Sequence, residues 1–345
     1  GVSHVPPGHC VRVDLSMKPL IQKVFRWWTP SVAETFHGSF EQAAEMLRDL
    51  FLESVKLHLR SDVPLGVALS GGLDSSAIAC AMRFLEPDMD IHTFSYISSD
   101  NCLSEEAWID VINGHIKAIP HKVYISGDDF IRDLPELILA QGEPFGGTSI
   151  YAQYCIFRCA RDSGITVMLE GQGGDELLGG YVGYPGQMML SYLERHVFGD
   201  MINFAKNWSK WPGRNRLGAW RALIGQLLPD FSYNFANSLI GRKTDTAWIN
   251  IPNLIDNKVR KKPIRPRKSI QGKGRRLVET LLQSLTISGL PHLLRYGDRN
   301  AMAFSVENRV PFLTLPLCEF LLSLPECYLV SISGETKAVF RRAMR

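Results

Sequence analysis

A glycine-rich loop with an acidic residue lies near the start of this 345-residue chain. An apolar segment at 65–69 runs into the sequence SGGLDSS at residues 70–76, where a helix is predicted to begin. Glycines let the backbone approach an anion closely, and the first amides of a helix point toward it with the helix dipole behind them. Asp74 beside phosphates would be repelled unless it held a cation, so it is a candidate Mg²⁺ ligand. The loop predicts a pyrophosphate site.

Two common phosphate-binding motifs do not match this loop. The Gly-Lys-Ser/Thr ending of a Walker A loop is absent, and so is the Gly-x-Gly-x-x-Gly pattern of a dinucleotide fold. A plain structural turn capped by Asp74 or Ser75 is the remaining alternative.

A second acidic loop, EGQGGDELLGGY, occupies residues 170–181 and follows another predicted buried strand at 166–170. The carboxyl ends of parallel strands share one edge of a sheet, where open α/β sheets bind their ligands. We therefore expect Asp175 and Glu176 to meet Asp74 across one metal ion.

The elements around these loops alternate between short apolar runs and helical segments. Such runs are typical of strands that are buried on both faces by helices. The fold class predicted is α/β, a doubly wound parallel sheet flanked by helices, with an α-rich part after Tyr184. A capping box at Ser39 and Gln42 predicts the helix that precedes the sheet. The strands expected are 65–69, 91–96, 122–125 and 166–170, and the helices are 75–84, 105–115, 129–140 and 149–161.

The first loop resembles the PP-loop of the N-type ATP pyrophosphatases, which split ATP between its α and β phosphates and form adenylates. This resemblance implies ATP as the nucleotide and an adenine nucleotide alpha hydrolase-like fold. By itself it does not choose among members such as tRNA-modifying enzymes and GMP synthetase. The nucleotide-binding positions implied are Leu69, Ser70, Gly71, Gly72, Asp74, Ser75, Ser76 and, on the second loop, Gly171.

Four further segments narrow the resemblance to the asparagine synthetases. The second loop is similar to their Gly-x-Gly-x-Asp-Glu motif, and RYGDRNAMA at 295–303 and VENRVPFL at 306–313 are similar to their later signature. GETK at 334–337 is similar to their lysine-bearing segment. The implied activity is ATP-dependent amide ligation, in which aspartate is activated as an acyl-adenylate and ammonia then displaces AMP.

The resemblance also implies roles for individual residues. Asp74 and Asp175 would bind Mg²⁺, while Lys337 would stabilise charge on the α-phosphate and Glu176 would act in the same acidic site. Two structural alternatives stay open. Lys337 could be a solvated surface lysine, and Arg309 with Glu307 could form only a structural ion pair.

Gln172 departs from the family pattern, which often carries glutamate there as a proposed general base. An amide can donate and accept hydrogen bonds but cannot take a proton. Another base or solvent must serve, or the acceptor differs, as in relatives that act on a peptide, a β-amino acid or a cell-surface polymer.

The two ends of the sequence suggest a fragment. Residues 1–30 resemble the tail of a glutaminase domain, and residues 31–345 the synthetase domain, whose end at Arg345 looks early. Cys10 is internal, so no amino-terminal cysteine nucleophile is present and this chain is not expected to hydrolyse glutamine. Ammonia would come from a glutaminase domain that is absent from the sequence.

Composition predicts a soluble cytoplasmic enzyme. Seven cysteines without a Cys-x-x-Cys pair disfavour a disulfide framework or a zinc site, and no apolar run reaches the ~20 residues that a bilayer requires. A net charge of +3 demands no polyanionic partner. Ten Lys or Arg residues at 258–276 indicate a solvated loop, with a silent nucleotide- or RNA-binding domain as the alternative. Aromatic residues that could stack bases are missing there, and a homodimer is left open.

Overall fold

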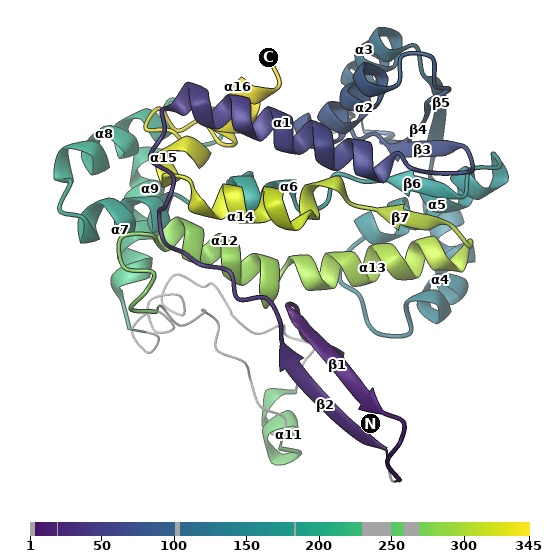
Figure 1. Ribbon diagram of the computed structural model, residues 1–345, viewed down its shortest axis with the longest axis horizontal. Helices are drawn as coiled ribbons and strands as arrows, with labels where there is room; N and C mark the ends of the chain where they lie inside the picture. The colour runs from purple at the N-terminus through teal and green to yellow at the C-terminus, as the bar shows by residue number, and fades with distance from the viewer. Residues whose placement is uncertain (1–3, 19, 101–103, 183, 230–249, 259–268) are drawn as a thin grey trace.

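A parallel sheet of five strands forms the centre of the molecule in the computed structural model, which describes residues 4–18, 20–100, 104–182, 184–229, 250–258 and 269–345 (Figure 1). The strand order is β5-β4-β3-β6-β7, and every pair is parallel. Successive strands run outward from β3 in both directions, so the topological switch point lies between β3 and β6. The strands are β3 (Leu65–Ala68), β4 (His92–Ile97), β5 (Ile119–Tyr124), β6 (Val167–Leu169) and β7 (Glu307–Arg309).

Helices cover both faces of this sheet, which confirms the predicted doubly wound α/β class (Figure 1). One layer contains α1, α2 and α3, and the other contains α4, α5 and α13. The bounds of α2 to α5 were predicted to within a few residues, and for α1 the start was predicted; α13 was expected only as part of the α-rich region after Tyr184. Their bounds are α1 (Phe40–His58), α2 (Leu73–Leu85), α3 (Glu106–Ile116), α4 (Gly127–Gln141), α5 (Ser149–Asp162) and α13 (Leu290–Ala303).

The start of α1 has the capping box that the sequence predicted. The Ser39 hydroxyl accepts the Gln42 amide at 3.2 Å, and the Gln42 side chain accepts the Ser39 amide at 2.8 Å. Two amides that have no partner within the helix are thereby satisfied. The helix then buries Leu47 and Phe51 against the core.

Strand β7 was not predicted. It has only three residues, Glu307, Asn308 and Arg309, none of them apolar. They pair in register with Val167, Met168 and Leu169 of β6, so the strand exists because of tertiary pairing. Its consequence is that Asn308 lies next to the carboxyl end of β6.

Most of the described residues after Tyr184 form helices that share the core of the sheet, as expected for an α-rich part. One apolar cluster runs from α1 and the sheet into these helices. The other helices formed by described residues are α6 (Gly174–Leu178), α7 (Pro185–Glu194), α8 (Phe198–Trp208), α9 (Arg216–Leu227), α11 (Ile251–Asp256), α12 (Arg276–Thr286), α14 (Leu315–Ser323), α15 (Glu326–Leu329), α16 (Ala338–Ala343) and the 3₁₀ turn η1 (Pro311–Leu313).

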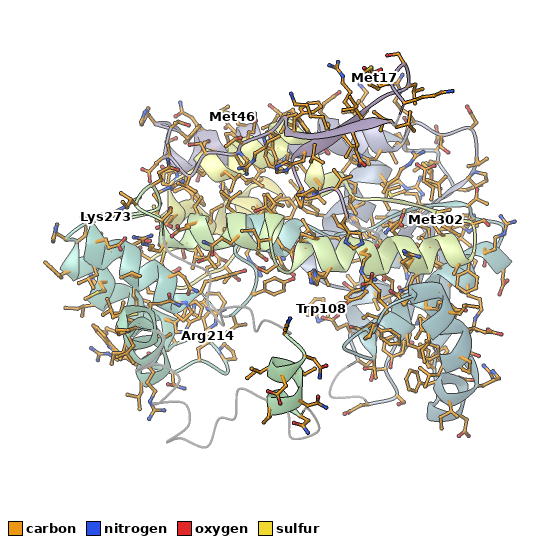
Figure 2. All side chains as sticks on the ribbon, turned by 90° about the horizontal axis from the view of Figure 1, so that it is seen from below. Met17, Met46, Trp108, Arg214, Lys273 and Met302 are labelled. Carbon is orange, nitrogen blue, oxygen red and sulfur yellow. The ribbon has the colours of Figure 1, made fainter. Side chains whose placement is uncertain are left out.

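An antiparallel hairpin, β1 (His9–Asp14) with β2 (Ile21–Arg26), lies near the amino end. All six residues of β2 are exposed, and the hairpin stands away from the sheet (Figure 1). Met17 lies in its turn at the outside of the molecule (Figure 2).

Part of the basic stretch contradicts the prediction of a solvated loop. Arg275 and Arg276 are buried. Their charges are compensated, since Arg275 donates to Glu34 and Arg276 pairs with Glu194 and Glu279. Buried guanidinium groups need such carboxylates, and most of these lie far away in sequence. Residues 259–268 of the stretch lie outside the described residues. Among the described residues, every helix is too short or too polar to traverse a bilayer.

Candidate active site

A cavity of ≈ 470 Å³ opens at the carboxyl edge of the sheet, beside the switch point between β3 and β6. The start of α2, the loop after β6, and the helices α5 and α13 contribute to its walls. Most of the predicted site residues line this cavity. They are Leu69, Ser70, Gly72, Asp74, Ser75, Gly171, Asp175 and Lys337.

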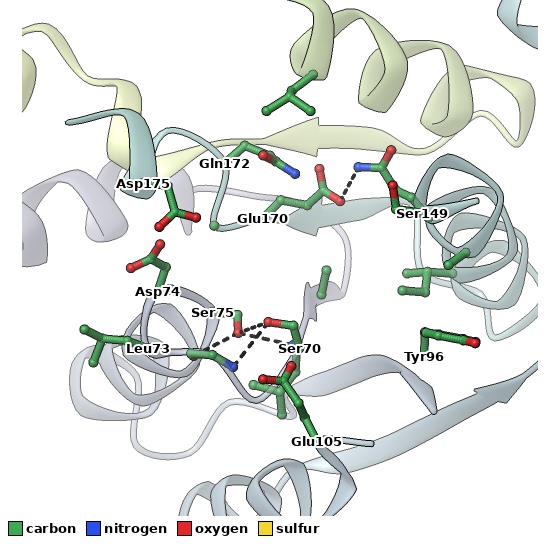
Figure 3. A pocket seen from close by; sticks show the side chains of 18 of the residues that line it. Ser70, Leu73, Asp74, Ser75, Tyr96, Glu105, Ser149, Glu170, Gln172 and Asp175 are labelled. Carbon is green, nitrogen blue, oxygen red and sulfur yellow. Dashed lines mark hydrogen bonds between the residues drawn. The ribbon is translucent and has the colours of Figure 1, made fainter. Parts of the chain in front are cut away.

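The phosphate loop is held in place by hydrogen bonds of its own serines (Figure 3). The Ser75 hydroxyl accepts the Ser70 amide at 3.2 Å and donates to the Gly72 carbonyl at 3.2 Å. The Gly72 amide in turn donates to the Ser70 hydroxyl at 3.3 Å. The helix α2 begins directly after this turn and has no side-chain cap, so its first amides are available to an anion.

Lys337 joins the two acidic loops. Its Nζ lies 2.6 Å from Asp74 Oδ2 and 2.6 Å from Asp175 Oδ1. Figure 3 shows the two carboxylates facing each other. The structure therefore brings both predicted metal ligands to a single cation, here the ammonium of Lys337.

Asp74 is the more buried of the two carboxylates. Burial raises its pKa, Lys337 lowers it, and the charges of Asp175 and Glu176 raise it further. Its Oδ1 is buried without a hydrogen-bond partner. An unpartnered carboxylate oxygen beside a second carboxylate is a fitting donor set for Mg²⁺, which is usually held by one or two carboxylates plus substrate phosphates. Among the described residues, no three His, Cys, Asp or Glu side chains form a metal-holding group without such phosphates.

Two glycines of the second loop allow this close approach. A Cβ built on Gly174 would lie 2.4 Å from Asp74 Oδ2, and one on Gly180 would lie 1.7 Å from Asp175 Oδ1. The Gly180 Cβ would also lie 2.2 Å from Lys337 Cε. Any larger residue would displace the charged groups, because no real contact is that short.

Lys337 is not the solvated surface lysine that the sequence left open. The residue is only 8% exposed, and its backbone has φ +56°, the left-handed region that a lysine rarely adopts. Such strained positions persist where the surroundings hold them, and they are concentrated at functional sites. Here the residue sits directly before α16.

Three predicted residues do not line the cavity. The Glu176 carboxylate is buried and accepts the Tyr181 hydroxyl at 2.6 Å, and burial together with this bond raises the pKa of Tyr181. Ser76 lines a different hollow on α2. Gly71 takes φ +81° beside Glu105 and shapes the turn.

A buried polar cluster at the cavity was not predicted from the sequence. Glu170 is 5% exposed, and its carboxylate accepts Gln153 Nε2 at 2.8 Å and Asn308 Nδ2 at 2.6 Å. Burial raises the pKa of Glu170, while the two amide bonds lower it. The local signal was an acid directly after a buried strand, but its amide partners come from α5 and β7.

Arg309 and Glu307 do form an ion pair, at 2.7 Å. Arg309 also donates to the carbonyls of His58 and Arg60, which tie β7 to the end of α1. Neither side chain lines the cavity, which agrees with the structural alternative.

Comparison with known proteins gives the same family for nearly the whole chain. The asparagine synthase family model matches residues 46–345. A putative glutamine-hydrolysing asparagine synthetase 2 of Methanocaldococcus jannaschii is 31% identical over 175 residues, which cover 51% of this chain and 33% of the relative. Asparagine synthetase 1 of Bacillus subtilis is 33% identical over 198 residues, 56% of this chain and 30% of the relative.

A longer alignment is found with glutamine-hydrolysing asparagine synthetase 2 of Bacillus subtilis. It is 26% identical over 339 residues, which cover 94% of this chain and 40% of the relative. The chain thus spans less than half the length of these curated relatives. The phosphate loop, the acidic loop and Lys337 meet at one cavity, and together with the family match they place this chain in the asparagine synthase family.

Proposed function

We propose that this chain is an ATP-dependent amide ligase that activates the side-chain carboxylate of aspartate as an acyl-adenylate and transfers ammonia to it. The observation that carries the proposal is the Lys337 ammonium held between Asp74 and Asp175, beside the start of α2. That arrangement places positive charge, helix amides and two candidate metal ligands in one cavity, as cleavage of ATP at the α-phosphate requires.

Each element has a role in this reaction. The amides at the start of α2 and the Ser70 turn would bind the pyrophosphate part of ATP. Asp74 and Asp175 would hold Mg²⁺, which when bound neutralises phosphate charge. Lys337 would then turn from the carboxylates to the α-phosphate as charge builds there. Glu176 would keep its place through Tyr181 and add negative charge to the metal site.

Ammonia is proposed to come from a glutaminase domain, because the relatives named above are glutamine-hydrolysing. The domain assignment follows. Residues 1–30, with the hairpin, would be the end of such a domain, and residues 31–345 the synthetase domain. The two hairpin strands are isolated from the main sheet, which supports this division.

A second candidate keeps the adenylation and changes the acceptor or the carboxylate. Gln172 lines the cavity with a neutral amide, and this residue favours a substrate other than aspartate and ammonia.

Exchange of labelled pyrophosphate into ATP would separate the candidates. The purified chain is incubated with MgATP, labelled pyrophosphate and one amino acid from a panel that includes aspartate. Exchange that depends on aspartate supports the first proposal, and exchange with another carboxylate supports the second. Absence of exchange with every carboxylate would contradict both.

A further inference from the structure

We propose that Glu170 is the general base of the amide-forming step, the group that takes the proton from the attacking nitrogen. This inference rests on the proposed function, and it assigns a role to a carboxylate that nucleotide binding does not use. Glu170 lines the cavity and follows the last residue of β6.

The position of Glu170 suits that role. The next residue, Gly171, packs on the start of α2, since a Cβ there would lie 3.3 Å from the Ser75 amide nitrogen. Glu170 therefore lies one residue from the turn that is proposed to bind the phosphates. Figure 3 shows it on the loop that also carries Gln172 and Asp175.

The carboxylate is held and oriented by amides alone. Gln153 and Asn308 each donate to one of its oxygens, and Asn300 fixes Gln153 by donating to its Oε1 at 3.0 Å. Gly297 of α13 closes over the cluster, because a Cβ there would lie 3.5 Å from Glu170 Oε2. A carboxylate has about four acceptor sites, so two amide donors leave capacity for an N–H of a bound amine.

A purely structural role explains this cluster poorly. Burying a carboxylate costs free energy, and burial outweighs the amide bonds in its effect on the pKa of Glu170. A glutamine side chain of the same shape could join α5 to β7 without that cost. An acid kept in a buried position that disfavours its charge is typical of a group used for proton transfer.

The other acids of the site are less suited to this role. Asp74 and Asp175 are both bound to Lys337, and Glu176 does not line the cavity. Glu105 lies against Gly71 of the phosphate turn. Among the described residues, Glu170 is the cavity carboxylate that is both buried and free of a cationic partner.

The step balances without a further reactant. The nitrogen lone pair of ammonia forms the C–N bond to the acyl carbon, and the carbonyl electron pair moves to oxygen. Glu170 takes one proton from the now positive nitrogen. The carbonyl re-forms as the bond to the AMP oxygen breaks, and AMP leaves with that electron pair. Glu170 then releases the proton to solvent.

The test separates adenylate formation from amide formation. Wild type and Glu170→Gln are assayed with MgATP and aspartate for pyrophosphate exchange, and with added ammonium chloride for asparagine and AMP. Glu307→Gln is the matched control, because Glu307 is exposed on β7 next to Asn308 and does not line the cavity. We expect E170Q to keep its exchange rate within about twofold and to lose roughly 10²–10⁴-fold in amide formation, the usual contribution of a general base.

The E170Q substitution is mild by design. The Asn308 Oδ1 atom is buried without a partner, so rotation of that amide by half a turn would let it accept the new N–H. Equal losses in exchange and amide formation, or unchanged amide formation, would overturn the role of Glu170. Absence of aspartate-dependent exchange in the wild type would instead refute the proposed function, and this inference with it.

Asn308→Ala provides a second measurement if E170Q does not fold. Removing this amide donor should raise the pKa of Glu170. The other two influences on that pKa are burial and the hydrogen bond from Gln153, and no charged group among the described residues contributes to it. The acidic limb of the pH profile for amide formation should therefore move to higher pH, while that for exchange stays in place. A limb that does not move counts against the proposal.

Discussion

Replacing Lys337 with methionine tests the charged centre of the site most directly. Methionine keeps an unbranched chain of similar length but removes the ammonium. The lost contacts are two oxygens at 2.6 Å, one from Asp74 and one from Asp175. At an effective dielectric constant of ~20, each pair at that distance has a gross attraction of roughly 6 kcal/mol.

The net cost is smaller than this gross attraction. In the variant there is no ammonium whose desolvation must be offset. Asp175 is 36% exposed, so the contribution of the Lys337–Asp175 pair to stability is reduced to ~1 kcal/mol or less. Breaking a buried pair by removing one partner costs about 3–5 kcal/mol. Because Asp74 can take up a proton instead of remaining charged, we expect a loss near the lower end, ~3 kcal/mol in the free energy of unfolding at neutral pH.

The loss should depend on pH in a defined direction. In the wild type the folded pKa of Asp74 is already raised above its ordinary value, and Lys337 restrains that rise. Without Lys337 the pKa of Asp74 in the folded state rises further. The variant therefore loses more stability than the wild type as the pH increases from the ordinary pKa of an aspartate to this raised pKa. The difference between the two proteins should shrink when acid protonates Asp74 in both.

Urea unfolding at several pH values measures this difference, and pyrophosphate exchange measures function. Lys122→Met is the matched control, since Lys122 also bridges two carboxylates, Glu106 and Asp110, both at 2.7 Å. Those carboxylates are more exposed, so the control should lose ~1 kcal/mol or less. K337M should lose about 10²–10³-fold in exchange, as expected for one stabilising donor. Equal destabilisation of the two variants, or a loss of stability in K337M that does not change with pH, would refute this account of Lys337, Asp74 and Asp175.

Four further outcomes are expected. Magnesium chloride without nucleotide should raise the melting temperature of K337M more than that of the wild type, because the two carboxylates regain a cation; an equal shift speaks against a metal site. E170Q should gain stability over the wild type as pH rises above the ordinary pKa of a glutamate, since burial raises the folded pKa of Glu170 and the amide has no charge to bury; calorimetry across pH checks the sign. Gly180→Ala should lower the free energy of unfolding by about 1–3 kcal/mol and abolish pyrophosphate exchange, because the added Cβ overlaps Asp175. Normal exchange in this variant would contradict the close packing of residue 180 on Asp175. Ser39→Ala should lower the free energy of unfolding, measured by urea titration, by ~1 kcal/mol and leave pyrophosphate exchange unchanged, since it removes only the cap of α1.

The sequence by itself determined the elements whose signals are local. The apolar run before Ser70, the glycines after it and the capping residue Ser39 act on their own neighbours in the chain, so strand, turn and helix could be predicted there. The shared edge of parallel strands then placed Asp74 near Asp175, because topology alone brings the ends of such strands together.

Tertiary structure decided what depends on distant partners. Strand β7 exists because polar residues pair with β6, and Glu170 acquires its environment from Gln153 and Asn308, which are 17 and 138 residues away. Arg275 and Arg276, which local charge indicated as solvated, are buried because carboxylates from other helices and loops meet them. The physical reason is the same in each case. The burial and pairing of a polar group are set by the groups that packing brings to it, and a local pattern does not contain them.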